Sequence, residues 1–360
     1  MTSAAFGSSS GTPLLFSPAE LSYLHTSLST VPPIRPDGRT ATEFRSLTAE
    51  TGILPATNGS AHVAFSDGSE AVVGVKVEVE RTGRGSRHDI DVNMMGASEQ
   101  KEGMGGRGRP EWATLTLMLP GVRDDDANLV FLEEMLREAL IVQQPSSPSS
   151  LLDKLVINSR WHWHIYIDVL LISSHGLASY PLPLLSMATH LALRDTRVPR
   201  LKSEAEEDPV ADDDWMASRW VYERKGKGEE SWLPPVTLLV AVVGENVLFD
   251  PSREELAVAD GVVAVSVADD GSGNGYRMVG MRMIDPPARD TMKGVPRSGE
   301  VPERAEIAGV WRPRVGGVKR SVLKSVIHAV LVGGVARDVI MGLDTFLTAE
   351  RDAERRAAGG

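Results

Sequence analysis

Apolar residues recur at helical spacing directly after a capping signal near the N-terminus. Residues 17–20 read Ser-Pro-Ala-Glu, which supplies an N-cap serine, a proline at the first helical position and a glutamate that can bond back to the cap. Three leucines then share one helical stripe: Leu21, Leu24 and Leu28. The pattern predicts a helix that ends before Pro32-Pro33, and a small, polar, disordered segment before it at residues 1–16.

From Phe44 to Glu80 the pattern changes to short alternating runs, which predict an antiparallel meander. The runs are separated by Asn58-Gly59 and Asp67-Gly68, dipeptides that readily adopt the positive φ angles of tight hairpin turns. In the last run one face is apolar and the other carries Lys76 and Glu78. The apolar face consists of Ala71, Val73, Val75, Val77 and Val79.

Further along the chain, strand and helix patterns alternate. Residues 82–111 are rich in Gly, Arg and Ser and predict a flexible insertion between two strands. The elements expected after it are a strand at 112–119, a helix at 128–142, one or two strands within 155–173 and a helix at 184–193. The helix at 128–142 carries a leucine stripe formed by Leu129, Leu132, Leu136 and Leu140.

A second βα-type half follows an acidic stretch at residues 201–233. Its expected elements are strands at 236–243, 262–267 and 276–284, a turn at 271–275 and a closing helix at 318–347 with a Gly333-Gly334 break. We therefore predict an α/β (α+β) protein with two βαβα-type halves. They span residues 17–200 and 234–349, and a charged tail occupies 350–360.

Composition narrows the functional classes. The 360 residues include no cysteine, so disulfides and thiolate metal sites are excluded, and a reducing compartment is expected. The apolar runs are too short for a membrane span, which predicts no membrane partner. A formal net charge of −11 should repel a polyphosphate, so any RNA must be held by partner proteins or by local basic patches.

Eight short segments occur in a fixed order along the chain: 34–39 (IRPDGR), 43–45 (EFR), 58–61 (NGSA), 67–68 (DG), 73–76 (VGVK), 165–175 (IYIDVLLISSH), 196–199 (TRVP) and 248–255 (LFDPSREE). Together they resemble the RNase PH family, and in particular the subunits that form the ring of the RNA exosome. The resemblance covers about Leu21 to Ile284, and the chain departs from it in length and composition at residues 82–111 and 202–232.

The resemblance implies an RNase PH fold with two halves of the ribosomal protein S5 domain 2-like kind. It also implies a ring of six RNase PH-like subunits, arranged as three heterodimers around a central channel and capped by RNA-binding proteins. In such a ring this chain would be a wall element that helps thread RNA toward a nuclease elsewhere. The implied role is 3′-to-5′ RNA processing and degradation in the nucleus, nucleolus and cytoplasm.

The residues that would carry phosphorolysis are replaced in this sequence. In active relatives an arginine that grips phosphate aligns with Asn128, which here follows Asp124-Asp125-Asp126, and three carboxylates would repel a dianion. Active relatives also carry a Glu-Asp pair with a further Asp six positions on, where this chain has Glu255-Leu256 and Val262. Asp260 could replace the missing carboxylate only if the register slipped by two residues.

An Asp-Gly that active relatives place after the central strand is His175-Gly176 here. These differences predict a non-catalytic structural subunit with no catalytic residue and no cofactor. The alternative is a phosphate-dependent 3′-to-5′ exoribonuclease of RNase PH type.

Other clusters favour structural interpretations. His162, His164, Tyr166 and Asp168 share one face of a strand and superficially resemble a two-histidine, one-carboxylate metal site, but an interior or interface strand is commoner, so no metal is expected. Ser173, Ser174 and His175 alternate in direction and cannot form a nucleophile and base without a turn. The glycine-rich residues 271–275 lack a following helix and lysine, which favours a hairpin turn over a phosphate cradle.

Arg107 and Arg109 are the candidate RNA-binding residues. Guanidinium groups suit phosphate, and a flexible loop can reach into a channel. A solvent-exposed linker is the simpler interpretation of the same two residues.

Overall fold

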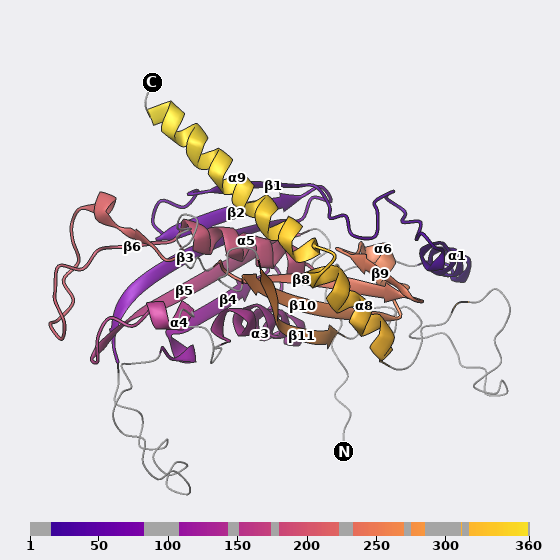
Figure 1. Ribbon diagram of the computed structural model, residues 1–360, viewed down its shortest axis with the longest axis horizontal. Coiled ribbons are helices and arrows are strands. Elements are labelled where there is room, and N and C mark those ends of the chain that lie inside the picture. The colour runs from indigo at the N-terminus through magenta and orange to yellow at the C-terminus, as the bar shows by residue number, and fades with distance from the viewer. Residues whose placement is uncertain are drawn as a thin grey trace, which may run out of the picture.

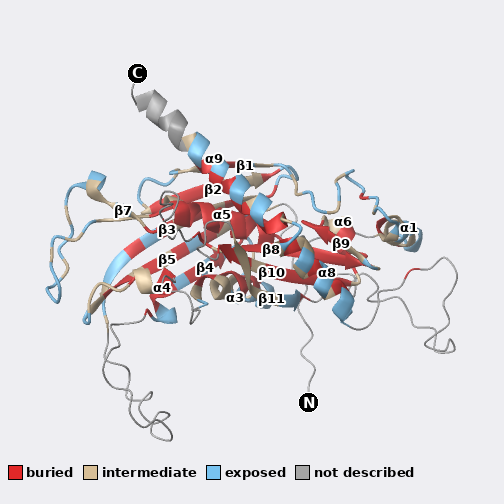
Figure 2. Ribbon diagram, viewed as in Figure 1, coloured by how far each residue is buried: buried red, intermediate tan, exposed pale blue. Residues whose placement is uncertain are grey.

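The computed structural model describes residues 16–82, 108–142, 151–173, 180–222, 233–269, 275–284, 311 and 317–358, with side chains up to residue 350. Within these ranges the chain forms a five-stranded sheet and a four-stranded sheet with helices packed against both (Figure 1). A single cluster of buried apolar residues extends through both sheets, and Figure 2 shows it along the centre of the molecule. The predicted α/β class is confirmed.

The first sheet has the strand order β1-β2-β3-β5-β4, in which only the β4–β5 pair is parallel. Its strands are β1 (Leu47–Thr51), β2 (Gly59–Phe65), β3 (Glu70–Arg81), β4 (Ala113–Met118) and β5 (Trp161–Ile172). Alternate residues of β3 are buried from Ala71 to Val77, as the pattern predicts, but Val79 is exposed. The opposite face of the sheet presents polar side chains such as Lys76, Glu78 and Asp168 to solvent.

The predicted hairpin turn at Asn58-Gly59 is wrong. Gly68 has a φ of +79° in the turn between β2 and β3, as expected, but the positive φ between β1 and β2 belongs to Gly52, at +67°. Gly59 instead begins β2, where a Cβ atom would lie 2.5 Å from the Thr196 backbone. This glycine is therefore required for close packing against the end of a helix and not for turn geometry.

The second sheet is antiparallel throughout, with the order β11-β10-β8-β9. Its strands are β8 (Val236–Val243), β9 (Asn246–Phe249), β10 (Gly261–Asp269) and β11 (Tyr276–Ile284). Every residue of β8 is buried, which explains its continuous apolar sequence. The short strand β9 and the single-turn helix α6 (Arg253–Leu256) were not predicted.

The helices α3 (Ala127–Ile141) and α5 (Leu182–Asp195) pack between the two sheets. All but the last residue of α5 is buried, because one side contacts β2 and β3 while the other contacts β8. The leucine stripe of α3 is buried as predicted: Leu129, Leu132, Leu136 and Leu140. A short helix, α4 (Leu151–Lys154), precedes β5, so residues 155–160 lie outside that strand.

The N-terminal helix α1 (Pro18–Ser29) has the predicted capping box between Ser17 and Glu20. The predicted closing helix is two helices, α8 (Arg320–Leu331) and α9 (Val335–Ala358), because Gly334 adopts a φ of +85° between them. Figure 1 shows α9 running across the molecule and projecting beyond the sheets. Residues 320–350 are long and apolar enough to cross a membrane, and a third of their most apolar stretch is buried inside the protein. Their buried apolar side chains are Val322, Val326, Val330, Val335, Ala336, Ile340, Leu343 and Leu347, whereas Val332 and Met341 are exposed.

The described part of the acidic stretch forms a projecting loop, seen at the left of Figure 1. It begins and ends at a two-stranded ribbon of β6 (Arg197–Val198) and β7 (Arg219–Trp220), with a short 3-10 helix at Trp215–Ala217. Lys202 pairs with Asp212 across the loop at 3.1 Å. Residues 1–15, expected to be disordered, and most of the predicted 82–111 insertion lie outside the described residues.

Candidate functional site

The family resemblance places the phosphate-gripping arginine of active relatives at the start of α3. Here the Asp126 side chain caps the helix, accepting hydrogen bonds from the backbone amides of Asn128 at 2.9 Å and Leu129 at 3.4 Å. Asn128 is exposed beside it, and the exposed Asp125 pairs with Arg123 at 2.7 Å. Two of the amides that could bind an anion at this helix end are therefore already used by a carboxylate, whose negative charge also disfavours a second anion there.

The positions of the expected carboxylate pair are occupied by core residues. Leu256 and Val262 have no exposed surface and belong to the apolar cluster of the molecule. Asp260 accepts a hydrogen bond from the Gly244 amide at 2.7 Å and lies 3.7 Å from His25, so it holds a turn beside α1. These side chains provide no carboxylate pair at the positions where the family resemblance requires one.

Glu255, the one acidic residue kept from that motif, is bound to an arginine. Arg35 donates from Nε and Nη2 to the two Glu255 oxygens, each at 2.7 Å, and neither side chain is exposed. Glu255 also closes a capping box with Ser252 at the start of α6. Both carboxylate oxygens of Glu255 are occupied by a buried guanidinium. Glu255 therefore holds α6 and Arg35 together and has no oxygen left for another ligand.

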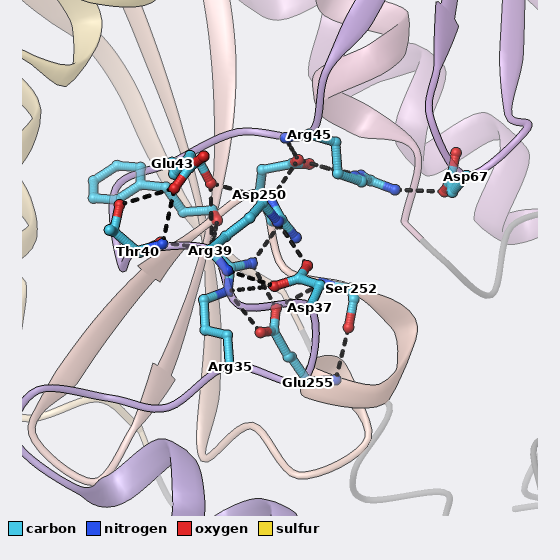
Figure 3. A network of polar contacts seen from close by, with 11 residues as sticks. Arg35, Asp37, Arg39, Thr40, Glu43, Arg45, Asp67, Asp250, Ser252 and Glu255 are labelled. Atoms are coloured by element: carbon cyan, nitrogen blue, oxygen red, sulfur yellow. Dashed lines mark hydrogen bonds and ion pairs between the residues drawn. The ribbon is translucent and has the colours of Figure 1, made fainter.

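Two further arginines converge on the buried carboxylate of Asp250, as Figure 3 shows. Arg45 donates to it from its backbone amide at 2.8 Å, from Nε at 2.9 Å and from Nη2 at 2.6 Å, and Arg39 donates at 3.1 Å. Hydrogen bonds and attraction from Asp250 raise the pKa of Arg45 against the effect of its burial. This network of arginines and carboxylates, called here the arginine network, joins residues 35–45 to the second sheet.

A surface hollow lies beside the arginine network, lined by Asp37, Arg39, Glu43, Phe44, Arg45, Ser46, Ser66, Asp67, Ser252, Arg253 and Glu254. Its lining contains three arginines and four carboxylates. Arg39 pairs with Asp37 at 2.6 Å, and Arg45 pairs with Asp67 at 2.5 Å. The positive charge is thus neutralised locally, which disfavours binding of a polyphosphate.

The predicted polar face of β5 is present in part. His162, His164 and Tyr166 gather at one end of the sheet, whereas Asp168 lies further along the strand opposite Gly74. The carboxylate that joins the histidines is Glu80, from the neighbouring strand β3. It accepts a hydrogen bond from the Tyr166 hydroxyl at 2.8 Å and lies 3.1 Å from His164 Nδ1.

The candidate RNA-binding residues are only partly described. Arg109 is exposed, just before the 3-10 helix at Pro110–Trp112, and lies near enough to His162 to act on its pKa. Arg107, Ser174, His175, Gly176 and the turn at 271–274 lie outside the described residues. Ser173, the one residue of the predicted Ser-Ser-His set that is described, lies beside Ser69, and their hydroxyl oxygens are 3.4 Å apart.

Sequence reasoning missed the roles of Arg35, Arg39 and Arg45. Their segments contribute to the family resemblance, but nothing local indicates that their partners lie more than 200 residues away. It also missed Glu80, although strict alternation along β3 places Glu80 on the same face as Lys76 and Glu78.

Comparisons with known proteins find similar sequences and a similar fold. Residues 43–199 match the RNase_PH family, described as "3' exoribonuclease family, domain 1". The chain is 32% identical to "Exosome complex component RRP42" of Saccharomyces cerevisiae, across 69% of this chain and 80% of that protein. It is 28% identical to "Exosome complex component rrp42" of Schizosaccharomyces pombe, across 72% and 81%.

A solved structure titled "Archaeal exosome core" has the same fold, with a TM-score of 0.52, 19% identity and coverage of 91% of this chain and 96% of that chain. The sequence identity and the coverage of both chains lead to one assignment. This protein belongs to the RNase PH family, in which its relatives of known name are Rrp42 exosome components.

Proposed function

We propose that this chain is a non-catalytic wall subunit of the RNA exosome ring. It pairs with another RNase PH-like subunit, helps to complete a six-membered ring beneath RNA-binding cap proteins, and guides RNA to a nuclease elsewhere. The relatives named as exosome components support this role, as does the solved exosome core with the same fold. We place the complex in the nucleus, including the nucleolus, and in the cytoplasm.

One observation carries the non-catalytic part of the proposal. Where active relatives need an arginine and a carboxylate pair, this chain has Asn128 beside an aspartate cap and two fully buried aliphatic side chains, Leu256 and Val262. Phosphorolysis needs cations or aligned donors where two anions meet, together with acidic groups for a metal or a proton. The net charge of −11 agrees with a subunit that relies on its neighbours to hold RNA.

A phosphorolysis assay tests this directly. We expect the purified full-length chain to leave a single-stranded RNA oligonucleotide unchanged, with or without inorganic phosphate, while an active RNase PH enzyme shortens it. Phosphate-dependent shortening that is lost in Asp260→Asn would instead establish the exoribonuclease alternative, since Asp260 is the only residue that a shifted register could recruit.

Association tests the structural part. Co-expression with the other RNase PH-like ring subunits of the same organism should give a stable heterodimer, and then a ring, by size-exclusion chromatography with light scattering. The subunits should be identified by mass spectrometry. A monodisperse monomer that joins none of these subunits would overturn the proposal, and the catalytic assay would not be affected.

A further inference from the structure

Two histidines and a glutamate converge at one end of the five-stranded sheet. Glu80 of β3 is directly opposite His162 of β5 in the antiparallel register, and His164 lies two residues further along the same face. Glu80 Oε2 is 3.1 Å from His164 Nδ1 and 3.9 Å from His162 Nε2. One ligand atom from each of the three side chains lies within 4.8 Å of the others.

Each of the three groups is oriented by a hydrogen bond on its far side. The Thr82 hydroxyl lies 3.1 Å from His162 Nδ1, and the Thr114 hydroxyl lies 2.9 Å from His164 Nε2. These contacts leave one nitrogen of each ring directed toward Glu80. Outer hydrogen bonds of this kind fix the tautomer and direction of histidines that bind metals.

The glutamate is oriented in the same way. The Tyr166 hydroxyl donates a hydrogen bond to Glu80 Oε1 at 2.8 Å, which leaves Oε2 beside His164 and His162. Imidazole nitrogen and carboxylate oxygen are both ligands that zinc-type ions bind.

Aromatic stacking holds the two imidazole rings in place. His162 stacks on Trp112 and His164 stacks on Tyr166, each with ring centroids 4.2 Å apart. The rings are therefore fixed from the side as well as by their hydrogen bonds, and little conformational freedom would be lost when an ion binds.

We propose that Glu80, His162 and His164 bind a divalent transition-metal ion of the zinc type, one that prefers imidazole and carboxylate ligands. A tetrahedral ion with bonds of about 2.0 to 2.1 Å separates its ligand atoms by about 3.3 Å. The Glu80 contacts of 3.1 and 3.9 Å lie on either side of that value, and the two imidazole nitrogens lie within 4.8 Å of each other. Side-chain shifts of up to about 1.5 Å would therefore bring the three atoms to the spacing of a tetrahedral site. Water would supply the fourth ligand, since the Glu80 side chain is partly exposed.

The same cluster could exist only as a hydrogen-bonded group, and the chain contains a control for that alternative. His62 pairs with Glu70 at 3.1 Å on the same sheet, and no second histidine among the residues that the structure describes joins them in a three-ligand group. A single imidazole and one carboxylate make a poor zinc site, whereas two imidazoles and a carboxylate match known three-ligand zinc sites.

The test is metal titration of the full-length chain after removal of any affinity tag and dialysis against a chelator. We expect one equivalent of Zn²⁺ by elemental analysis, and an intense visible absorption of tetrahedral type when Co²⁺ replaces it. Glu80→Gln and His164→Ala should abolish this stoichiometric binding, while the control His62→Ala should retain it. Thr114→Val, which removes only the outer hydrogen bond, should weaken binding by about 10- to 100-fold.

Thermal unfolding gives a second readout that does not depend on activity. Zn²⁺ should raise the Tm of the wild-type chain and of His62→Ala, but not that of Glu80→Gln, because only a folded state that binds the ion is stabilised. Glu80 is partly exposed, so Glu80→Gln should fold and remain testable. A wild-type chain that binds no stoichiometric metal, or that binds it equally well in Glu80→Gln, would overturn the inference and leave the proposed function unchanged.

Discussion

Arg35 and Glu255 form a bidentate ion pair that is completely buried, although 220 residues separate them in the chain. Arg35 also donates to the backbone oxygens of Thr40, Phe249 and Asp250. Removing one member of such a pair leaves an uncompensated buried charge. We therefore expect Arg35→Met to lower the free energy of unfolding by about 3 to 5 kcal/mol, measured by urea denaturation.

The double variant Arg35→Met/Glu255→Met provides the companion measurement. With both charges removed, it should be less destabilised than Arg35→Met alone, because no unpaired carboxylate remains. Lys76→Met, which breaks an exposed pair with Glu78, should change stability little. A single variant as stable as the wild type would show that Glu255 finds another partner or is protonated.

His190 of α5 should make stability depend on pH. It is buried, and its Nδ1–H donates to the Pro234 carbonyl oxygen at 2.8 Å. Burial, with the nearby Arg194, lowers the pKa of His190 to about 3 from an ordinary value of 6.5. Between these two values the unfolded chain binds a proton that the folded chain does not, so stability falls as the pH falls.

The slope of that loss is about 1.4 kcal/mol for each pH unit below the unfolded pKa. We expect His190 alone to lower the free energy of unfolding by about 2 kcal/mol when the pH falls from 7 to 5. His190→Asn, which keeps a donor for the Pro234 carbonyl, should remove that part of the pH dependence in denaturation curves at the two pH values. An unchanged difference between pH 7 and pH 5 would contradict the assignment.

Gly59→Ala should destabilise the protein through backbone contact. The new Cβ would lie 2.5 Å from the Cα and backbone nitrogen of Thr196, which cannot move aside as a flexible side chain can. Overpacking of this kind costs about 1 to 3 kcal/mol. Gly342→Ala is the matched control, since Gly342 lies in α9 with open space around it. This variant should raise the free energy of unfolding by about 0.5 to 1 kcal/mol, measured by thermal or chemical denaturation.

The RNA contact expected of Arg109 is best tested in the assembled ring. If Arg109 binds a phosphate, Arg109→Ala should weaken RNA binding and reduce the slope of log affinity against log salt by about 0.7. Arg123→Ala is the comparison, because Arg123 is exposed but already paired with Asp125. Equal salt slopes for the wild type and Arg109→Ala in filter-binding assays would exclude this contact.

Much of the fold follows from periodicity alone. Strands β8 and β11 have the predicted bounds, because a long apolar or alternating run indicates both the type of element and its ends. The four-residue elements β9 and α6 are too short to show a period, so only tertiary pairing defines them. The role of Gly59 was unpredictable for a related reason, since its constraint comes from Thr196, far away in the chain.

The candidate site divides in the same way. The replacement of a phosphate-binding arginine by Asn128, and of two expected carboxylates by Leu256 and Val262, could be inferred from motif spacing, because each motif is local in sequence. The partner of Glu255 could not be inferred, since Arg35 lies 220 residues away in the chain and meets Glu255 only in the folded protein. To predict that Glu80 meets the histidines of β5, one must know how β3 and β5 are aligned in the sheet. These strands are far apart in the chain, with β4, α3 and α4 between them, so no local sequence pattern gives their register.

The position of α5 limits how the protein can be divided. One side of this helix covers the five-stranded sheet and the opposite side covers β8, so its burial needs both. A fragment that stops before the second sheet would expose the apolar side of α5 that normally packs on β8. Such a fragment should aggregate when it is expressed alone. Gene-splitting or tag-insertion strategies should therefore keep residues on both sides of α5 in one polypeptide. Insertions should be placed in the exposed part of the projecting loop between β6 and β7, at residues 203–210.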